Sequence, residues 1–128
     1  MKENQELIEY RISRAKETLI EAKKLFDDNL IYGSVNRLYY ACFYVVLALL
    51  LSKDINAKTH KGVRNQFHLK FILTNEIEKK HSQFFSEIFA QRGESDYDDF
   101  AEVDKDVMAE WIEKTSEFIS NVEKYLKD

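Results

Sequence analysis

The feature that most constrains this chain is the absence of proline: none of its 128 residues is proline, and only three are glycine. Proline removes a backbone hydrogen bond and breaks helices, so a chain without it is free to build long ones. Hydrophobic residues make up 45% of the chain and charged residues 33%, which is typical of a folded domain. We therefore expect a single all-α domain over residues 1–128.

Apolar residues spaced three and four apart predict five helices, arranged as an up-and-down bundle with one short crossing helix. The expected ranges are about 4–28, 34–53, a short helix from Thr59 to about 72, a fourth beginning between Asn75 and Ser82, and about 104–126. Asn4, Thr59 and Asp104 are the expected N-caps, and Asn29 with Gly33 is expected to turn the chain. The core faces are predicted to include Ile8, Ile12, Ala15, Leu19, Ala22, Phe26, Val63, Phe67, Phe71, Phe84, Phe85, Ile88, Phe89, Val107, Trp111, Thr115, Phe118, Val122 and Tyr125.

The longest apolar run, "LYYACFYVVLALLL" (38–51), has fourteen residues, and three of them are tyrosines. A membrane span needs about 20 residues, so this run predicts the most buried core helix and no membrane segment. The single cysteine, Cys42, lies inside the run and is expected to be a core residue in a reducing, cytoplasmic setting. Residues 1–15 are charged, so we expect no signal peptide.

Charge is distributed unevenly along the chain. The net charge of −4 disfavours indiscriminate binding to nucleic acid. Residues 53–70, however, hold five Lys or Arg and two His against one Asp, and residues 94–106 hold seven Asp or Glu against one Lys. The ordinary interpretation of both segments is a solvated surface.

Polar residues interrupt the core pattern first at the start of the second helix. Asn36 and Arg37 come just before the apolar run, and Tyr40 follows Asn36 by one turn. A buried asparagine needs hydrogen-bond partners, because an unsatisfied polar group costs about 1–3 kcal/mol. These residues are therefore candidates for one wall of a binding site.

The second interruption is "QRGESDYDDF" (91–100), which follows the aromatic stretch "FFSEIFA". Arg92 comes four residues after Ile88, so helical spacing keeps it near the buried side. Asp96 lies one turn further on, and Tyr97 follows it. One interpretation is an Arg92–Asp96 pair that only closes a helix, and the other is a polar site in which Gly93 ends the helix beside a groove.

Three segments together resemble a prokaryotic HEPN domain: "GSVNRLYYACFYVVLALL" (33–50), "KTHKGVRNQF" (58–67) and "RGESDYDDF" (92–100). More narrowly, the chain is similar to the small stand-alone HEPN proteins often encoded beside a minimal nucleotidyltransferase. The resemblance implies a helical bundle that forms a homodimer, with a polar groove at the dimer interface. It also implies a role with nucleotides or RNA, in a toxin–antitoxin or defence-type system.

Ribonuclease members of this family carry an arginine, four to six residues, and then a histidine. Arg92 matches the arginine, but Tyr97 stands where the histidine is expected, and no histidine follows His81. A phenol with a pKa near 10 transfers protons poorly near neutral pH, unlike imidazole. Arg92, Asp96 and Tyr97 therefore remain candidates for catalysis, and Asn36, Arg37, Tyr40, Arg92 and Tyr97 are candidates for nucleotide binding.

The remaining motifs are weaker. Arg64 is followed four positions later by His68, which comes close to the arginine–histidine spacing but falls in the wrong segment for the family. His60 is interpreted as an ordinary surface or core histidine. The acidic "DYDD" (96–99) lacks the spacing of a calcium loop, so we expect no metal and no cofactor. Three classes of function stay open: a HEPN partner of a nucleotidyltransferase, an active ribonuclease, and a purely structural helical module.

Overall fold

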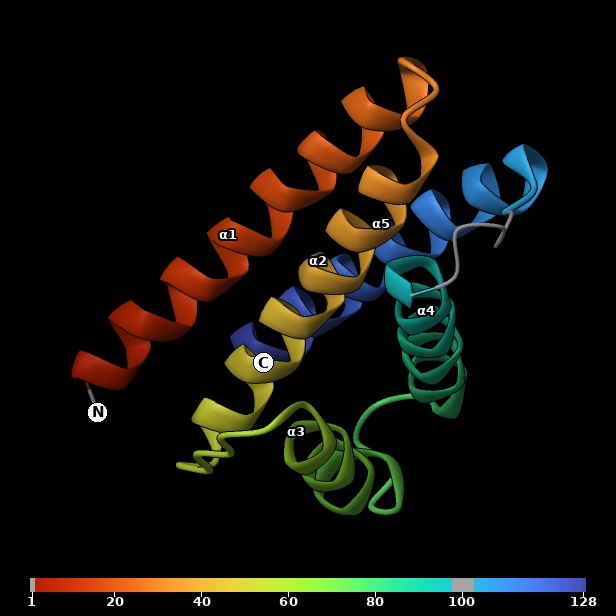
Figure 1. Ribbon diagram of the computed structural model, residues 1–128. Helices are drawn as coiled ribbons and strands as arrows, with labels where there is room; N and C mark the ends of the chain where they lie inside the picture. The colour runs from red at the N-terminus through yellow and green to blue at the C-terminus, as the bar shows by residue number, and fades with distance from the viewer. Residues whose placement is uncertain (1, 98–102) are drawn as a thin grey trace.

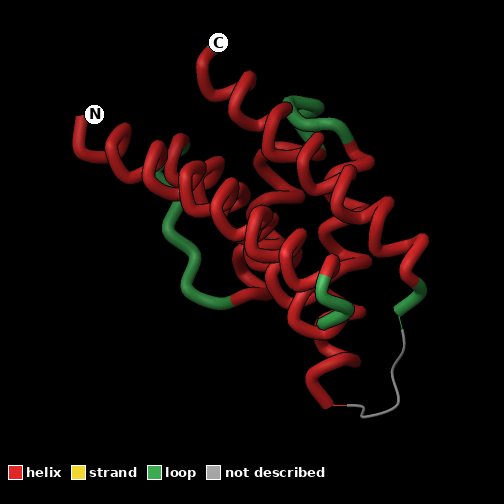
Figure 2. The backbone as a smooth tube through the Cα atoms, turned by 90° about the horizontal axis from the view of Figure 1, so that it is seen from above, coloured by secondary structure: helices red, strands yellow, loops and turns green. Residues whose placement is uncertain are grey.

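A computed structural model describes the backbone of residues 2–97 and 103–128, and the side chains of residues 4–92 and 103–128. Every regular element within these ranges is helical, as Figure 2 shows. The predicted all-α bundle is therefore confirmed. The elements are α1 (Lys2–Asp27), α2 (Ile31–Ser52), α3 (His60–Phe67), the π-helical segment η1 (His68–Ile72), α4 (Lys79–Tyr97) and α5 (Lys105–Lys127).

The first two helices form an antiparallel pair, and α5 packs against both of them (Figure 1). The remaining helices, α3 and α4, contact α2 and lie away from α1. The two ends of the described chain lie at the same end of the bundle (Figure 2). Here the side-chain amide of Asn4 donates a hydrogen bond of 2.6 Å to the carboxylate of Asp54.

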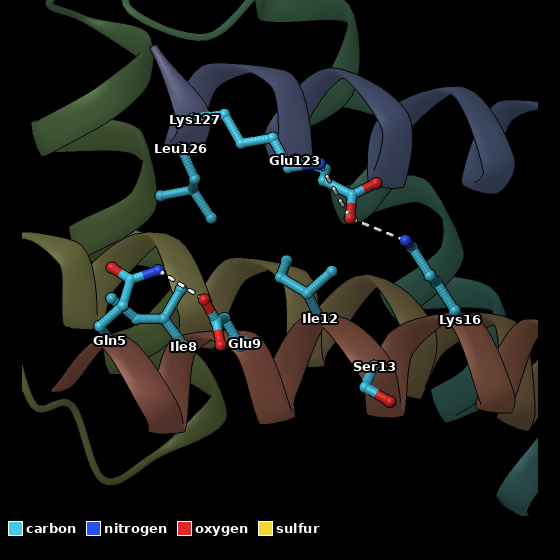
Figure 3. Close-up of a pocket in the computed structure, with 9 residues that line it drawn as sticks. All are labelled: Gln5, Ile8, Glu9, Ile12, Ser13, Lys16, Glu123, Leu126 and Lys127. Atoms are coloured by element: carbon cyan, nitrogen blue, oxygen red, sulfur yellow. Dashed lines mark hydrogen bonds and ion pairs between the residues drawn. The ribbon is translucent and has the colours of Figure 1, made fainter. Parts of the chain in front are cut away.

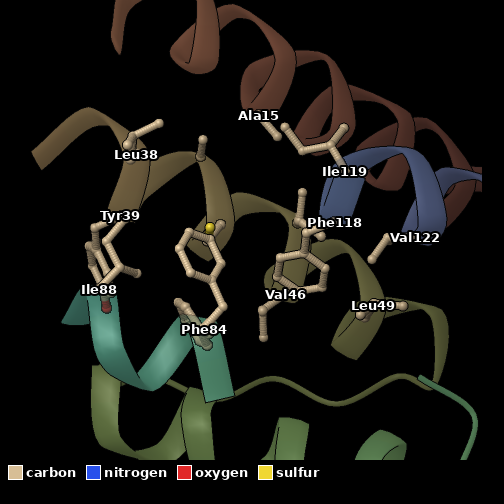
Figure 4. Packing of buried hydrophobic residues seen from close by; sticks show 14 of the residues in the cluster. Ala15, Leu38, Tyr39, Val46, Leu49, Phe84, Ile88, Phe118, Ile119 and Val122 are labelled. Atoms are coloured by element: carbon tan, nitrogen blue, oxygen red, sulfur yellow. The ribbon is translucent and has the colours of Figure 1, made fainter. Parts of the chain in front are cut away.

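The core is centred on α2, as the apolar run predicts. Figure 4 shows Leu38, Tyr39 and Leu49 of this helix packed among residues of α1, α4 and α5. By length and composition α2 could cross a membrane, but 61% of its most apolar window is buried inside the bundle, as in a core helix. Its fully or nearly fully buried residues are Ser34, Val35, Leu38, Tyr39, Ala41, Cys42, Val45, Val46, Ala48, Leu49 and Leu50.

Two predictions at the start of the chain are wrong. Asn4 is not an N-cap, because α1 already begins at Lys2 and the Asn4 side chain bonds Asp54 instead. Gly33 is not part of the turn but lies inside α2. In this turn Asn29 takes the left-handed conformation, with φ of 62°. The missing side chain of Gly33 instead lets α1 approach, because a Cβ there would lie 3.3 Å from Leu25.

The short helix α3 begins where its cap predicts. The hydroxyl of Thr59 accepts a hydrogen bond of 2.9 Å from the backbone N–H of Gly62. After Phe67 the helix widens into the π-helical turn η1, which the sequence pattern did not reveal. The predicted core face of this segment is confirmed, because Val63, Phe67 and Phe71 are all buried.

The last helix also begins as predicted, with the carboxylate of Asp104 accepting a hydrogen bond of 2.7 Å from the N–H of Asp106. Its core face is confirmed except at its first position. Val107 was predicted to be buried but is 36% exposed, because Met108 occupies the core position three residues before Trp111. Both spacings are compatible with a helix, so the pattern alone did not decide between these neighbours.

Candidate functional site

Arg92 projects from α4 toward α2, as its spacing predicts. Its guanidinium carbon lies 5.4 Å from the ring centre of Tyr39 and 5.5 Å from that of Tyr40. One terminal amino group donates a hydrogen bond of 3.3 Å to the Tyr40 hydroxyl. A cation over aromatic faces in a half-buried position is held in place while keeping its charge. Arg92 is thus a fixed positive group at the edge of the core.

The other predicted residues of α2 lie beside Tyr40. The guanidinium carbon of Arg37 is 5.3 Å from the Tyr40 ring centre, so two arginines lie close to this ring. Arg37 also donates a hydrogen bond of 2.8 Å to the amide oxygen of Asn36 and pairs with Glu21 at 3.6 Å. The structure therefore brings Arg37, Tyr40 and Arg92 together. Asn36 supports Arg37 and has no described contact with Arg92.

The structure adds a residue that the sequence interpretation set aside. His60, the first residue of α3, packs its ring against Phe43 with ring centres 4.7 Å apart. Its Nδ1 lies 2.5 Å from the hydroxyl oxygen of Tyr39. The imidazole therefore belongs to the same aromatic cluster as Arg92, although His60 and Arg92 are far apart in the sequence.

Arg64 reaches this cluster from the next turn of α3. Its guanidinium carbon lies 4.0 Å from the ring centre of Phe89 on α4. The ring centre of Phe89 in turn lies 5.5 Å from that of Tyr39. His60 and Arg64 are four residues apart, so they share one face of the helix. This spacing was the signal in the sequence that could have identified them. His68, by contrast, is exposed.

The charged and titratable groups of this cluster affect one another. Burial lowers the pKa of His60, and the positive charges of Arg92 and then Arg64 lower it further. The imidazole is therefore neutral at pH 7. Burial also raises the pKa of Tyr39, so its hydroxyl keeps its proton. The cluster thus combines two guanidinium groups, a neutral imidazole and a neutral phenol.

The predictions for the end of α4 are answered only in part. The prediction that Gly93 ends the helix is wrong, because α4 continues to Tyr97. One glycine within a helix costs about 1 kcal/mol relative to alanine and does not by itself stop it. The side chains of Asp96 and Tyr97 lie outside the described residues, so the Arg92–Asp96 pair remains a prediction.

A separate cavity of about 250 Å³ lies between α1 and α5 (Figure 3). Ile8, Ile12 and Leu126 form its apolar part, and the Lys16–Glu123 ion pair of 2.7 Å lies at one side. None of the predicted site residues with described side chains lines it. Within the described residues, no three His, Cys, Asp or Glu side chains gather in a way that would hold a metal ion.

Comparison of the sequence with known proteins shows the family of this chain. The family model described as "HEPN domain" matches residues 8–125, which is nearly the whole chain. The chain belongs to the HEPN domain family. The resemblance carried by the three sequence segments is thereby confirmed.

Three curated relatives match this chain over most of their own length. A UPF0332 protein of Thermotoga maritima is 36% identical over 128 residues, covering 100% of this HEPN chain and 97% of the relative. Two proteins of Methanocaldococcus jannaschii, each named as a candidate toxin, are both 34% identical. The first match covers 93% of this chain and 81% of the relative, and the second covers 99% and 94%.

Proposed function

We propose that this HEPN protein is the toxin-type member of a two-protein system and that its site binds a nucleotide or RNA. The observation that carries the proposal is Arg92, whose guanidinium is held over the rings of Tyr39 and Tyr40 next to His60. A fixed guanidinium suits phosphate oxygens, and aromatic faces suit bases. The names of the two M. jannaschii relatives support the toxin assignment.

The proposal includes a homodimer with the site in a groove at its interface. Its support is a row of half-buried residues on the outer face of α2, here called the α2 stripe: Tyr40, Phe43, Tyr44, Leu47 and Leu51. The neighbouring face of α1 adds Tyr10, which is 61% exposed. Continuous apolar surface of this kind commonly marks an interface. A two-fold axis near the α2 stripe brings two copies of Arg92 toward one groove.

The proposed partner is a minimal nucleotidyltransferase encoded beside this protein. The support is the likeness of the chain to stand-alone HEPN proteins that occur in such gene pairs. An adjacent nucleotidyltransferase gene, followed by co-purification of the two proteins from one cell, is the direct test. Separate elution of the two proteins at micromolar concentration would remove the partner from the proposal.

The ligand is tested with Arg92→Ala, measured for RNA and nucleotide binding and for RNA cleavage in a metal chelator. Lys114→Ala is the matched control, because Lys114 is also a cation over an aromatic ring, 5.9 Å from the centre of Phe84, but it lies on α5. We expect Arg92→Ala to lose RNA and nucleotide binding while it still forms the dimer, and Lys114→Ala to keep both properties. If Arg92→Ala binds like the parent and only melts earlier, the arginine closes a helix and the proposed site is wrong.

Cleavage of RNA without metal is the second candidate, because His60 places an imidazole in the same cluster as Arg92, whereas this sequence lacks the histidine that the family motif has after the arginine. A cleaving parent protein that loses activity in both Arg92→Ala and Tyr97→Phe assigns catalysis to the end of α4. A parent that binds RNA without cleaving it leaves binding as the function.

A further inference from the structure

Arg64 carries a charge that no described carboxylate neutralises. Its guanidinium lies on the face of Phe89, and its Nε is buried without a hydrogen-bond partner. A buried donor left unpaired costs free energy, and burying a charge without a partner costs more. The protein nevertheless holds this cation beside the aromatic cluster. Such an arrangement is expected where a charged ligand, and not the protein itself, supplies the counter-charge.

His60 belongs to the same aromatic cluster and can add a hydrogen-bond donor to it. The Tyr39 hydroxyl keeps its proton, and within the described residues its one hydrogen bond is to Nδ1 of His60. If Nδ1 donated instead, the hydrogen of this buried hydroxyl would have no described acceptor; we therefore assign Tyr39 as the donor, which puts the hydrogen of the neutral imidazole on Nε2. The fully buried Tyr39 thus fixes the tautomer of His60, and Nε2, the ring nitrogen that does not contact Tyr39, carries the N–H group.

The position of α3 strengthens the positive potential. His60 is the first residue of this helix, where unpaired backbone N–H groups and the helix dipole favour negative charge. Lys58 and Lys61, on either side of His60 in the sequence, are both exposed. The carboxylate of Glu21 is paired with Arg37. A local basic surface thus exists on a protein of net charge −4.

We propose that His60 and Arg64 of α3, together with Arg92 of α4, form a binding site for a phosphate group of an RNA strand. The inference rests on the proposed function, since it shares Arg92, and it adds α3 as the second side of the site. Two guanidinium groups and a neutral N–H match the several acceptor oxygens and the negative charge of a phosphate. Lys58 and Lys61 extend the basic surface along a strand, which favours RNA over a single nucleotide.

The test compares Arg64→Gln and His60→Gln with the parent, using inorganic phosphate, adenosine monophosphate and a single-stranded RNA oligonucleotide as separate probes. His68→Gln is the control, because His68 follows the same helix but is exposed. We expect both site variants to weaken RNA binding at least tenfold and the control to leave it unchanged. We also expect bound phosphate to raise the pKa of His60, which NMR of the imidazole nitrogens measures. The charged and titratable groups that face His60 are Tyr39, Tyr40, Arg64 and Arg92.

The outcomes separate this inference from the proposed function. If Arg64→Gln and His60→Gln bind RNA like the parent while Arg92→Ala does not, α3 takes no part and only the further inference fails. If Arg92→Ala also binds like the parent, both proposals fail. Equal affinity for adenosine monophosphate and RNA would keep the phosphate site but overturn the choice of a strand. Circular dichroism of each variant confirms that the helical fold is intact.

Discussion

The hydroxyl oxygen of Tyr39 lies 2.5 Å from Nδ1 of His60, so a fully buried tyrosine of α2 holds the ring at the start of α3. This contact ties the core to the candidate site. The phenol ring packs flat against Phe85 of α4, with ring centres 5.7 Å apart. The orientation of the imidazole is therefore fixed by the same residue that joins α2 to α4.

Tyr39→Phe removes the hydroxyl and leaves the ring. We expect a loss of about 1 kcal/mol in the free energy of unfolding, because one hydrogen bond is lost and Nδ1 of His60 loses its partner. Urea unfolding at pH 7 measures the change. Tyr10→Phe is the control, since Tyr10 is 61% exposed. Equal stability of the two variants would show that the Tyr39–His60 hydrogen bond contributes nothing to folding.

Leu49→Ala tests the assignment of α2 as the core helix. Leu49 has no exposed surface, so its truncation is expected to cost about 2–5 kcal/mol. The matched control is Leu73→Ala, which removes the same atoms from a side chain that is 62% exposed. We expect the control to change stability by less than about 0.5 kcal/mol. Similar costs for both would contradict the burial of α2.

The buried histidine His81 predicts a loss of stability in mild acid. Its ring stacks on Phe118 at 4.8 Å, and its Nε2 lies 3.0 Å from the amide nitrogen of Asn121. Burial, and then the charge of Lys80, lower its pKa. As the pH falls through 6.5, His81 therefore takes up a proton in the unfolded chain before it does so in the folded protein. The contribution of His81 to the free energy of unfolding is complete above pH 6.5 and falls as the pH decreases.

Unfolding of the parent protein at pH 7.5 and pH 5.5 measures this effect. His81→Gln is expected to show a smaller decrease in stability between these two values than the parent. His60 has its pKa lowered in the same direction, so part of the decrease remains in the variant. His68→Gln, at an exposed position, serves as the control. An unchanged pH dependence in His81→Gln would rule out its titration as the cause.

Glu76 predicts a loss of stability at lower pH than His81 does. Its carboxylate accepts hydrogen bonds from Lys53 at 2.6 Å, Thr74 at 2.7 Å and Tyr125 at 2.7 Å, and these bonds, Lys53 first, lower its pKa to about 2. The contribution of the Glu76 carboxylate to the free energy of unfolding is present above the ordinary glutamate pKa and is lost as the pH falls toward 2. Because the group is one-third exposed, we expect Glu76→Gln to cost about 1 kcal/mol at pH 7.

The measurement is the difference in unfolding free energy between Glu76→Gln and the parent at pH 7 and at pH 3. We expect the difference to shrink at pH 3, where the carboxylate advantage is being lost. Glu110→Gln is the control, because among the described residues Glu110 pairs with Lys114 alone, on the exposed surface of α5. If the difference in unfolding free energy were the same at pH 7 and at pH 3, the charge of Glu76 would not contribute to stability.

The helices were predictable because their apolar residues repeat with the helical period, and Thr59 and Asp104 were predictable as caps because their side chains bond their own helices. The start of α2 was not, because its cap, Leu30, makes no side-chain hydrogen bond and Gly33 serves packing instead of a turn. Asn4 failed as a cap because its partner, Asp54, is distant in sequence.

The candidate site shows the same division. Arg92 was predictable because its position follows from Ile88 on one helix. His60 and Arg64 were not linked to it, because only tertiary packing brings α3 against Tyr39 and Phe89. The wide turn η1 after α3 also lay beyond the pattern, since a run of apolar residues does not distinguish a π-turn from an α-turn.

The hydrogen bond from Arg92 to Tyr40 joins residues 52 positions apart in the chain. During synthesis the chain emerges from its N-terminus, and the α1–α2 pair, whose contacts are close in sequence, forms before α4 exists. The guanidinium reaches the tyrosines only after α2, α3 and most of α4 have left the ribosome. A nascent chain of this HEPN protein therefore has no assembled site until the residues up to Arg92 have emerged and packed against α2.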